Sequence, residues 1–104
     1  MRTVRILADA AEEAIEAAIW YERQRPGLGT DFFEAFEAAT DLVEAGHIPF
    51  TPYPGKAGAA GAKRVILKRF PYDIVIVERA TELVVIAVAH QSRKPGYWRE
   101  RLTP

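Results

Sequence analysis

The chain has 104 residues, of which 49% are hydrophobic and 27% are charged. These values are ordinary for a globular protein and exclude disordered and fibrous classes. The length predicts one domain over residues 1–104. The absence of cysteine excludes a disulfide scaffold and cysteine-based zinc or nucleophile sites, and it fits a cytoplasmic location. No stretch approaches 18 apolar residues, so we expect neither a membrane span nor a signal peptide.

The formal net charge of zero hides a division between the two halves of the chain. Residues 1–50 carry four arginines against ten acidic residues, a net charge of −6, whereas residues 51–104 carry ten cationic residues against four acidic ones, a net charge of +6. Basic surface on the second half favours an anionic partner, such as a nucleic acid or an acidic protein. The alternative is that the two halves solvate and attract each other.

The first half predicts a strand and a helix. The strand spans Arg2–Leu7, and Asp9 is placed to cap a helix that runs to about Arg25, with Glu12 at capping-box spacing. Its expected apolar stripe consists of Ala11, Ile15, Ala18 and Ile19, widened by Trp20 and Tyr21, and its expected wet face consists of Asp9, Glu12, Glu13 and Glu16.

A second helix follows the break at Pro26-Gly27. Thr30 is its predicted N-cap, and the helix runs to about Ala45. Four apolar residues repeat at helical spacing and are assigned to the core: Phe32, Phe36, Ala39 and Val43. The two helices should lie antiparallel and pack on the sheet.

Residues 46–62 are rich first in proline and then in glycine and alanine. We expect a loop without helix or strand pairing, and loops of this length tend to be functional or mobile. The glycines alone are a weak phosphate-binding signal, because no Gly-Lys-Ser/Thr sequence is present.

Three strands are predicted next, over Lys63–Phe70, Tyr72–Arg79 and Glu82–His90. The second and third are apolar on both faces and should be central. The fold class is therefore α+β, with the order β-α-α-β-β-β, a mainly antiparallel sheet and a short helical tail that starts at Pro95. In that tail, Tyr97 and Trp98 are more simply explained as anchors of the terminus than as surface residues.

This order of elements resembles the RelE/ParE superfamily of small bacterial toxins over nearly the whole chain. The residues that carry the resemblance are Trp20-Tyr21-Glu22, Arg25-Pro26-Gly27-Leu28-Gly29, Phe32-Phe33, Pro49, Lys63-Arg64, Phe70-Pro71-Tyr72 and the ending with His90, Arg93, Tyr97, Trp98 and Arg101. The resemblance implies the toxin of a type II toxin–antitoxin operon, held inactive in a hetero-oligomer with a cognate antitoxin. It also implies two mechanisms on one fold, since RelE-like members cut messenger RNA in the ribosome and ParE-like members bind DNA gyrase.

A nuclease would need proton transfer and phosphate stabilisation. His90 is the candidate acid or base, Arg64, Arg79 and Arg93 are candidate phosphate stabilisers, and Tyr97 is a candidate stacking or acid residue. Lys63 and Lys68 would anchor the RNA backbone. No metal or other cofactor is expected, because His47 and His90 have no acidic or cysteine cluster at ligand spacing.

Two features disfavour the nuclease. The chain is neutral overall, and His90-Gln91 differs from the His-Tyr ending of some nuclease members; a histidine at a strand end more often bonds to backbone or tail than catalyses. A gyrase inhibitor needs exposed aromatic and arginine anchors, for which Tyr97, Trp98 and Arg101 are candidates, as is the loop over residues 46–62. Lys63, Lys68 and Arg79 are further candidates for binding the target. The sequence favours the ParE-like mechanism over the RelE-like one. A third interpretation is an inactive relative that only binds antitoxin and regulates its operon.

An antitoxin segment with apolar anchors is expected along the two-helix face or the sheet edge. Its acidic residues would meet Arg64, Arg93 or Arg99.

Overall fold

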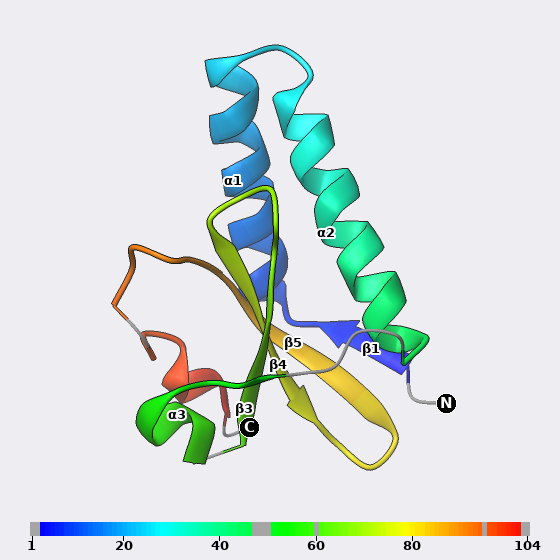
Figure 1. Ribbon diagram of the computed structural model, residues 1–104, viewed down its shortest axis with the longest axis vertical. Helices are drawn as coiled ribbons and strands as arrows, with labels where there is room; N and C mark the ends of the chain where they lie inside the picture. Colours follow the sequence, from blue (N-terminus) through cyan, green and yellow to red (C-terminus); the bar gives the residue numbers. More distant parts are fainter. Residues whose placement is uncertain (1–2, 47–50, 60, 95, 103–104) are drawn as a thin grey trace.

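The computed structural model describes residues 3–46, 51–59, 61–94 and 96–102. Its elements in chain order are β1 (Thr3–Ile6), α1 (Ala8–Gln24), α2 (Leu28–Glu44), β2 (Thr51–Pro52), α3 (Gly55–Ala59), β3 (Ala62–Ile66), β4 (Tyr72–Glu78), β5 (Glu82–His90) and the 3-10 helix η1 (Arg99–Leu102) (Figure 1). The α+β class is confirmed, as are the antiparallel helix pair and the short helical tail. No helix among the described residues is long and apolar enough to cross a membrane.

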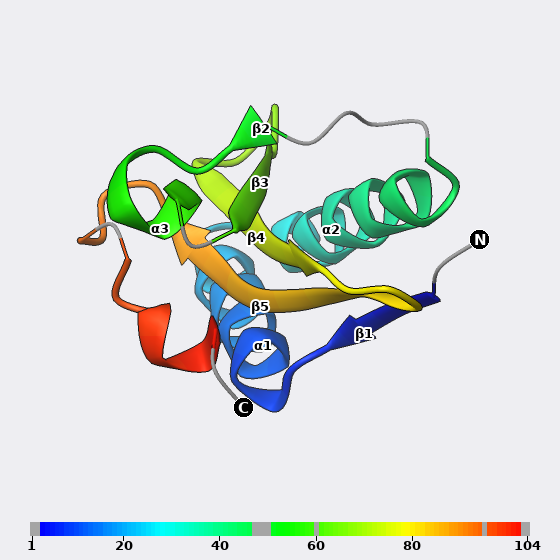
Figure 2. The same ribbon diagram turned by 90° about the horizontal axis from the view of Figure 1, so that it is seen from below.

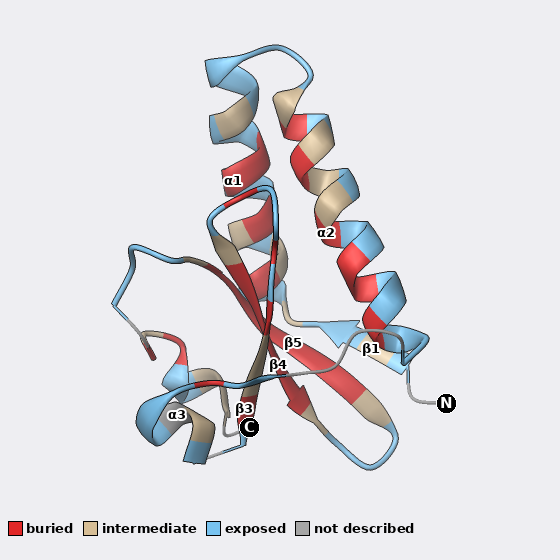
Figure 3. Ribbon diagram, in the orientation of Figure 1, coloured by how far each residue is buried: buried red, intermediate tan, exposed pale blue. Residues whose placement is uncertain are grey.

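The five strands form one sheet in the order β1-β5-β4-β3-β2. β1 runs parallel to β5, and the other pairs are antiparallel. β4 and β5 are central and buried on both faces, as their two-sided apolar pattern predicts (Figure 3). Their pairing sets Tyr72 opposite His90, so the start of β4 and the end of β5 lie together at one end of the sheet.

The two faces of the sheet are covered by different parts of the chain. α1 and α2 cover one face, where Phe32 of α2 belongs to the same buried cluster as Ile74 and Val85 of the sheet. On the other face, Tyr53 and Trp98 cover strand residues such as Val75 and Ile86. Figure 2 shows this division, with α2 on one side of the strands and α3 with the C-terminal segment on the other. The predicted core residues Phe32, Phe36, Ala39 and Val43 are all buried.

Neither helix is capped as predicted. α1 begins after Leu7 and α2 after Gly27, and neither start has a side-chain cap hydrogen bond, so the predicted caps Asp9 and Thr30 are wrong. Gly27 adopts the left-handed conformation, with φ of 90°, and this starts α2 earlier than Thr30 would. The carboxylate of Glu22 accepts the N–H groups of Gly27 and Gly29, each at 3.0 Å, and so satisfies donors that an N-cap would otherwise bind.

The buried face of α1 also differs from the prediction. It consists of the small residues Ala10, Ala14, Ala17 and Ala18, whereas Ile15 and Ile19 are each 47% exposed and Trp20 is 55% exposed. Alanine lets the helix backbone come close to the sheet and to α2, and this close approach outweighs the larger apolar area that Ile15 and Ile19 would bury.

The predicted first strand of the hairpin is too long, and the preceding loop is more structured than expected. β3 ends at Ile66, because the N–H of Leu67 bonds to the carbonyl of Tyr72 and closes the turn. β2 pairs with β3, and α3 follows it, so the expectation of a loop without helix or pairing is wrong. The predicted tail start at Pro95 lies outside the described residues, and so do His47 and Pro49.

Candidate functional site

A cleft of about 420 Å³ lies where β3, β4 and β5 meet the C-terminal segment. Its lining contains all four residues that the nuclease hypothesis assigned to catalysis, namely Arg64, His90, Arg93 and Tyr97. The strand register explains this convergence, because Ile66 pairs with Asp73 and Asp73 with Ala89, the neighbour of His90. The chain then turns at Gln91, whose N–H bonds to the carbonyl of Pro71, and brings Arg93 to the same end of the sheet.

Arg64 is held by a buried carboxylate in this cleft. Its Nη1 donates to Asp73 Oδ2 at 3.2 Å, and Gln91 Nε2 donates to Asp73 Oδ1 at 3.2 Å. Asp73 is 4% exposed, so its charge depends on these two partners. The Arg64 guanidinium also lies 5.3 Å from the centre of the Tyr53 ring. Arg64 is therefore fixed in place, and much of its positive charge is already neutralised.

His90 bonds to the turn that follows it. Its Nδ1 accepts the backbone N–H of Ser92 at 3.0 Å and lies 2.7 Å from Ser92 Oγ. Because a ring nitrogen that accepts a backbone N–H carries no proton, the proton of neutral His90 lies on Nε2. The expected bond from a strand-end histidine to backbone is confirmed.

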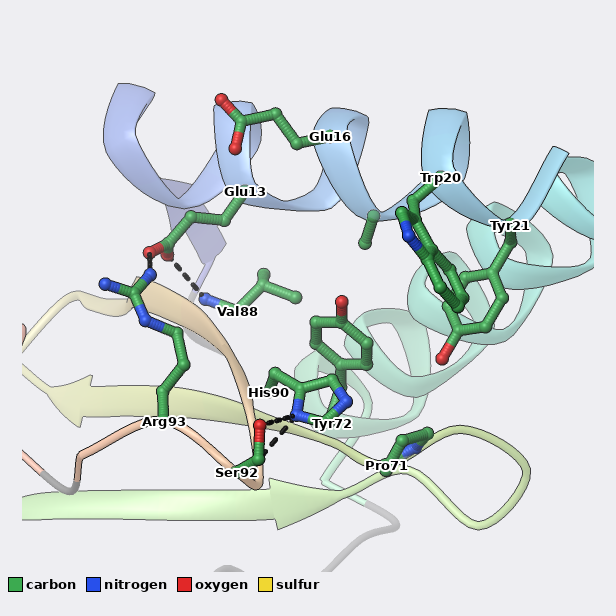
Figure 4. Close-up of a pocket in the computed structure, with 11 residues that line it drawn as sticks. Glu13, Glu16, Trp20, Tyr21, Pro71, Tyr72, Val88, His90, Ser92 and Arg93 are labelled. Carbon is green, nitrogen blue, oxygen red and sulfur yellow. Dashed lines mark hydrogen bonds and ion pairs between the residues drawn. The ribbon is translucent and has the colours of Figure 1, made fainter. Parts of the chain in front are cut away.

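Sequence reasoning missed Glu13, which it assigned to the wet face of α1. The side chain is only 13% exposed. Its carboxylate accepts the N–H of Val88 at 3.0 Å, the hydroxyl of Tyr97 at 2.6 Å and Nη1 of Arg101 at 2.9 Å. Arg93 Nη1 lies 3.7 Å from the same carboxylate (Figure 4). The available signal was the alanine stripe, since Glu13 lies one turn from Ala10 and Ala17 and hence at the edge of the buried face.

Tyr97 bonds to the carboxylate of Glu13. Burial, together with the hydrogen bond to Glu13, raises the pKa of Tyr97 well above that of an ordinary tyrosine. The Arg93 guanidinium lies 3.7 Å from the centre of the Tyr97 ring. Tyr97 therefore keeps its proton at neutral pH, and its hydroxyl donates a hydrogen bond to Glu13.

Two predicted target-binding residues anchor the C-terminal segment. Trp98 is 1% exposed and meets Tyr53 edge to face, with ring centres 5.0 Å apart. Arg101 also donates to the carbonyl of Ile86 at 2.9 Å, and its side chain is 20% exposed. As placed, Trp98 presents no surface to a partner, which fits the anchoring role that the sequence favoured.

The other predicted cations do not line this cleft. Lys63 on β3 pairs with Glu78, and Arg79 donates to the carbonyl of Leu102 at 3.3 Å. Lys68 is exposed in the turn between β3 and β4. In the described ranges, no group of three or more His, Asp or Glu residues is arranged to hold a metal ion.

No protein-family model and no curated protein sequence matches this chain. Among solved structures, the chain is similar to one from the chromosomal ParDE TA (toxin–antitoxin) system of P. aeruginosa, with a TM-score of 0.74 and 13% sequence identity. The match covers 86% of this chain and 96% of that one. At this identity the likeness establishes a common fold, so the chain has the fold of a protein from a toxin–antitoxin system.

Proposed function

We propose that this chain is the toxin of a type II toxin–antitoxin system, neutralised by a cognate antitoxin, and that it inhibits growth through a ParE-like interaction with DNA gyrase. The observation that carries the proposal is the fold likeness to a ParDE chain, which extends over most of both molecules. The RelE/ParE-like order of motifs along the sequence agrees with it.

The contacts in the 420 Å³ cleft support a protein target over an RNA substrate. The hydroxyl of Tyr97 already donates a hydrogen bond to Glu13, and Arg64 is paired with Asp73. A phosphate group bound beside Arg64 would lie close to the buried carboxylate of Asp73, which repels negative charge. A protein interface requires none of these residues to transfer a proton.

A ribosome-dependent ribonuclease is the second candidate, and one observation favours it. Arg64, His90 and Arg93 converge on a single cleft, and the Nε2 of His90 carries the proton of the neutral ring. In this mechanism Nε2 would protonate the leaving 5′-oxygen, and Arg93 would stabilise the phosphate.

We place the antitoxin on the exposed side of the two helices. Ile15 and Ile19 are one turn apart on α1, each 47% exposed, and form an apolar pair that a helical or extended segment can cover. Acidic residues of that segment would meet Arg93 or Arg99, which are exposed, more readily than Arg64, which Asp73 already pairs.

The two mechanisms are separated by assays on the purified chain. With DNA gyrase, we expect inhibited supercoiling and trapped cleavage complexes, and this activity should survive His90→Ala. With ribosomes carrying messenger RNA, we expect intact message. Message cleavage that is lost in both His90→Ala and Arg93→Ala, with gyrase unaffected, would reject the gyrase mechanism in favour of the ribonuclease.

A further inference from the structure

A second cleft, of about 530 Å³, lies between α1 and the adjoining ends of β4 and β5 (Figure 4). Trp20, Tyr21 and Tyr72 provide aromatic walls, and the lining also includes Glu16, His90 and Arg93. It is separate in composition from the cleft around Arg64, although His90 and Arg93 contribute to both.

The aromatic wall is both exposed and supported. Trp20 is 55% exposed, and its ring meets that of Tyr21 edge to face at 5.1 Å. Tyr21 in turn packs on Phe32 at 5.5 Å and on Phe70 at 4.9 Å, which ties the wall to the core. An indole that is supported on one side and open on the other offers a ring face to a ligand.

Glu16 supplies a negative charge beside this ring. It lies one helical turn before Trp20 on α1, which places the two side chains on the same face. Glu16 has no hydrogen bond or ion pair to any other described residue, whereas the acidic residues nearer the tail are paired: Glu13 with Arg93 and Arg101, and Asp9 with Arg101. Among the acidic residues that line this cleft, Glu13 is paired with Arg93, so the carboxylate of Glu16 is the negative charge that a partner can satisfy.

The chain already holds one of its own arginines by the same combination of ring and carboxylate. The Arg93 guanidinium lies 3.7 Å from the centre of the Tyr97 ring, and its Nη1 lies 3.7 Å from Glu13 Oε2. Trp20 and Glu16 present the same two groups, and across the described part of the chain no cation lies over the Trp20 ring.

We propose that this second cleft binds the guanidinium of an arginine on a partner protein segment, stacked on Trp20 and paired with Glu16. Arginine fits better than lysine because its planar group can stack on an indole and bond a carboxylate with two N–H groups at once. Glu16 extends outward in Figure 4 and is exposed, so its side chain can change rotamer toward a bound guanidinium without displacing a buried residue. The inference goes beyond the proposed function, because it concerns which chemical group the cleft recognises. It applies whether the target is DNA gyrase or ribosome-bound messenger RNA.

The test is an NMR titration of the purified chain with N-acetyl-arginine amide and, separately, with the uncharged isostere N-acetyl-citrulline amide. The indole N–H of Trp20 should shift in a saturable way with the arginine probe, while that of buried Trp98 stays unchanged. The citrulline probe should bind at least about fivefold more weakly, the range expected for one exposed ion pair.

Two variants complete the test. Glu16→Gln should weaken the binding of the arginine probe, though less than the change to citrulline does, because citrulline also loses the cation–π contact with Trp20. Glu12→Gln, an exposed acid on the same helix, should leave the affinity unchanged. Both positions are exposed, so the variants should fold, and thermal unfolding verifies this. Equal binding of the two probes, no shift at Trp20, or unchanged affinity in Glu16→Gln would each overturn the inference.

Discussion

One carboxylate on α1 holds the C-terminal segment against the sheet. Glu13 accepts hydrogen bonds from Val88 on β5 and from Tyr97 and Arg101 beyond it, so it joins three parts of the chain that are far apart in sequence. Hydrogen bonds to charged groups contribute about 1.5–3 kcal/mol each, and removing the charge leaves a half-buried Arg101 with a poorer partner. Glu13 therefore governs both stability and the position of Arg93 and Tyr97 in the cleft.

We predict that Glu13→Gln lowers the free energy of unfolding by about 2–3 kcal/mol, because Gln keeps the shape of the side chain but loses its charge. Urea unfolding measures this. Glu12→Gln, on the exposed side of the same helix turn, is the control and should stay within about 0.5 kcal/mol of wild type. Equal stability of the two variants would mean that Glu13 does not hold the tail.

The ion pair between Arg5 and Glu82 predicts that the stability of the fold depends on pH. Arg5 donates to its carboxylate from Nε at 3.1 Å and from Nη2 at 2.9 Å, and these bonds lower the pKa of Glu82. Because the folded pKa lies below the unfolded one, the pair stabilises the fold above the unfolded pKa, and this contribution is lost as the pH falls through the folded pKa. An NMR titration should give Glu82 a midpoint below that of an ordinary glutamate, and Arg5→Gln should return it to the ordinary range. An unchanged midpoint in Arg5→Gln would show that the pair does not form in solution.

The helix pair depends on a close approach of α1 and α2 near their connection. Gly29 at the start of α2 faces α1, and a Cβ added there would lie 2.5 Å from the carbonyl oxygen of Ala18. That oxygen belongs to the α1 backbone and cannot move without shifting the helix. The small side chains of α1 and the glycine of α2 are therefore parts of the same close packing.

Gly29→Ala should destabilise the fold by about 1–2 kcal/mol, since the clash outweighs the roughly 1 kcal/mol by which alanine is favoured over glycine in a helix. Glu34→Ala, on the exposed side of α2, is the matched control and should change stability by less than about 0.5 kcal/mol. Denaturant unfolding compares the two. If Gly29→Ala is as stable as its control, the helices do not approach each other as closely as described.

Elements with a strong two-sided or aromatic pattern could be predicted from the sequence. β4 and β5 are apolar on both faces, and the phenylalanines of α2 repeat at helical spacing. These patterns fit few other secondary structures or positions in the fold. The buried face of α1 could not be predicted. Hydrophobicity favours burial of Ile15 and Ile19, whereas the observed packing depends on the close approach that the alanines allow. β2 and α3 were missed because two residues of pairing and one helical turn carry almost no periodic signal.

For the whole molecule, some of the opposite charges of the two halves pair with each other. Arg69 pairs with Asp31 at 3.1 Å, Arg101 with Glu13 at 2.9 Å, and Arg93 lies 3.7 Å from Glu13. Part of the positive charge of the second half is thus neutralised by acidic residues of the first half, and less positive charge remains to bind a nucleic acid. This agrees with the protein target that we propose.

The cleft around Arg64 could be predicted in part from the order of the strands in the sheet. Arg64 lies on β3, and His90 and Arg93 lie at or just beyond the end of β5. These two strands flank β4 on either side, so the convergence of the three residues at one end of the sheet follows from strand order. The pairing of Arg64 with Asp73 and the role of Glu13 could not be predicted, because both depend on which side chains burial brings within hydrogen-bonding distance.

The measurement that tests the central claim most directly is growth of a bacterial host after induction of this chain, with and without co-expression of the product of its adjacent gene. We predict growth arrest with a DNA-damage response when the chain is expressed alone, and normal growth when the two proteins are expressed together and co-purify. Normal growth of the host with the soluble chain alone would contradict the toxin assignment and leave an inactive relative. Arrest without a DNA-damage response, accompanied by cuts in ribosome-bound message, would contradict the gyrase mechanism.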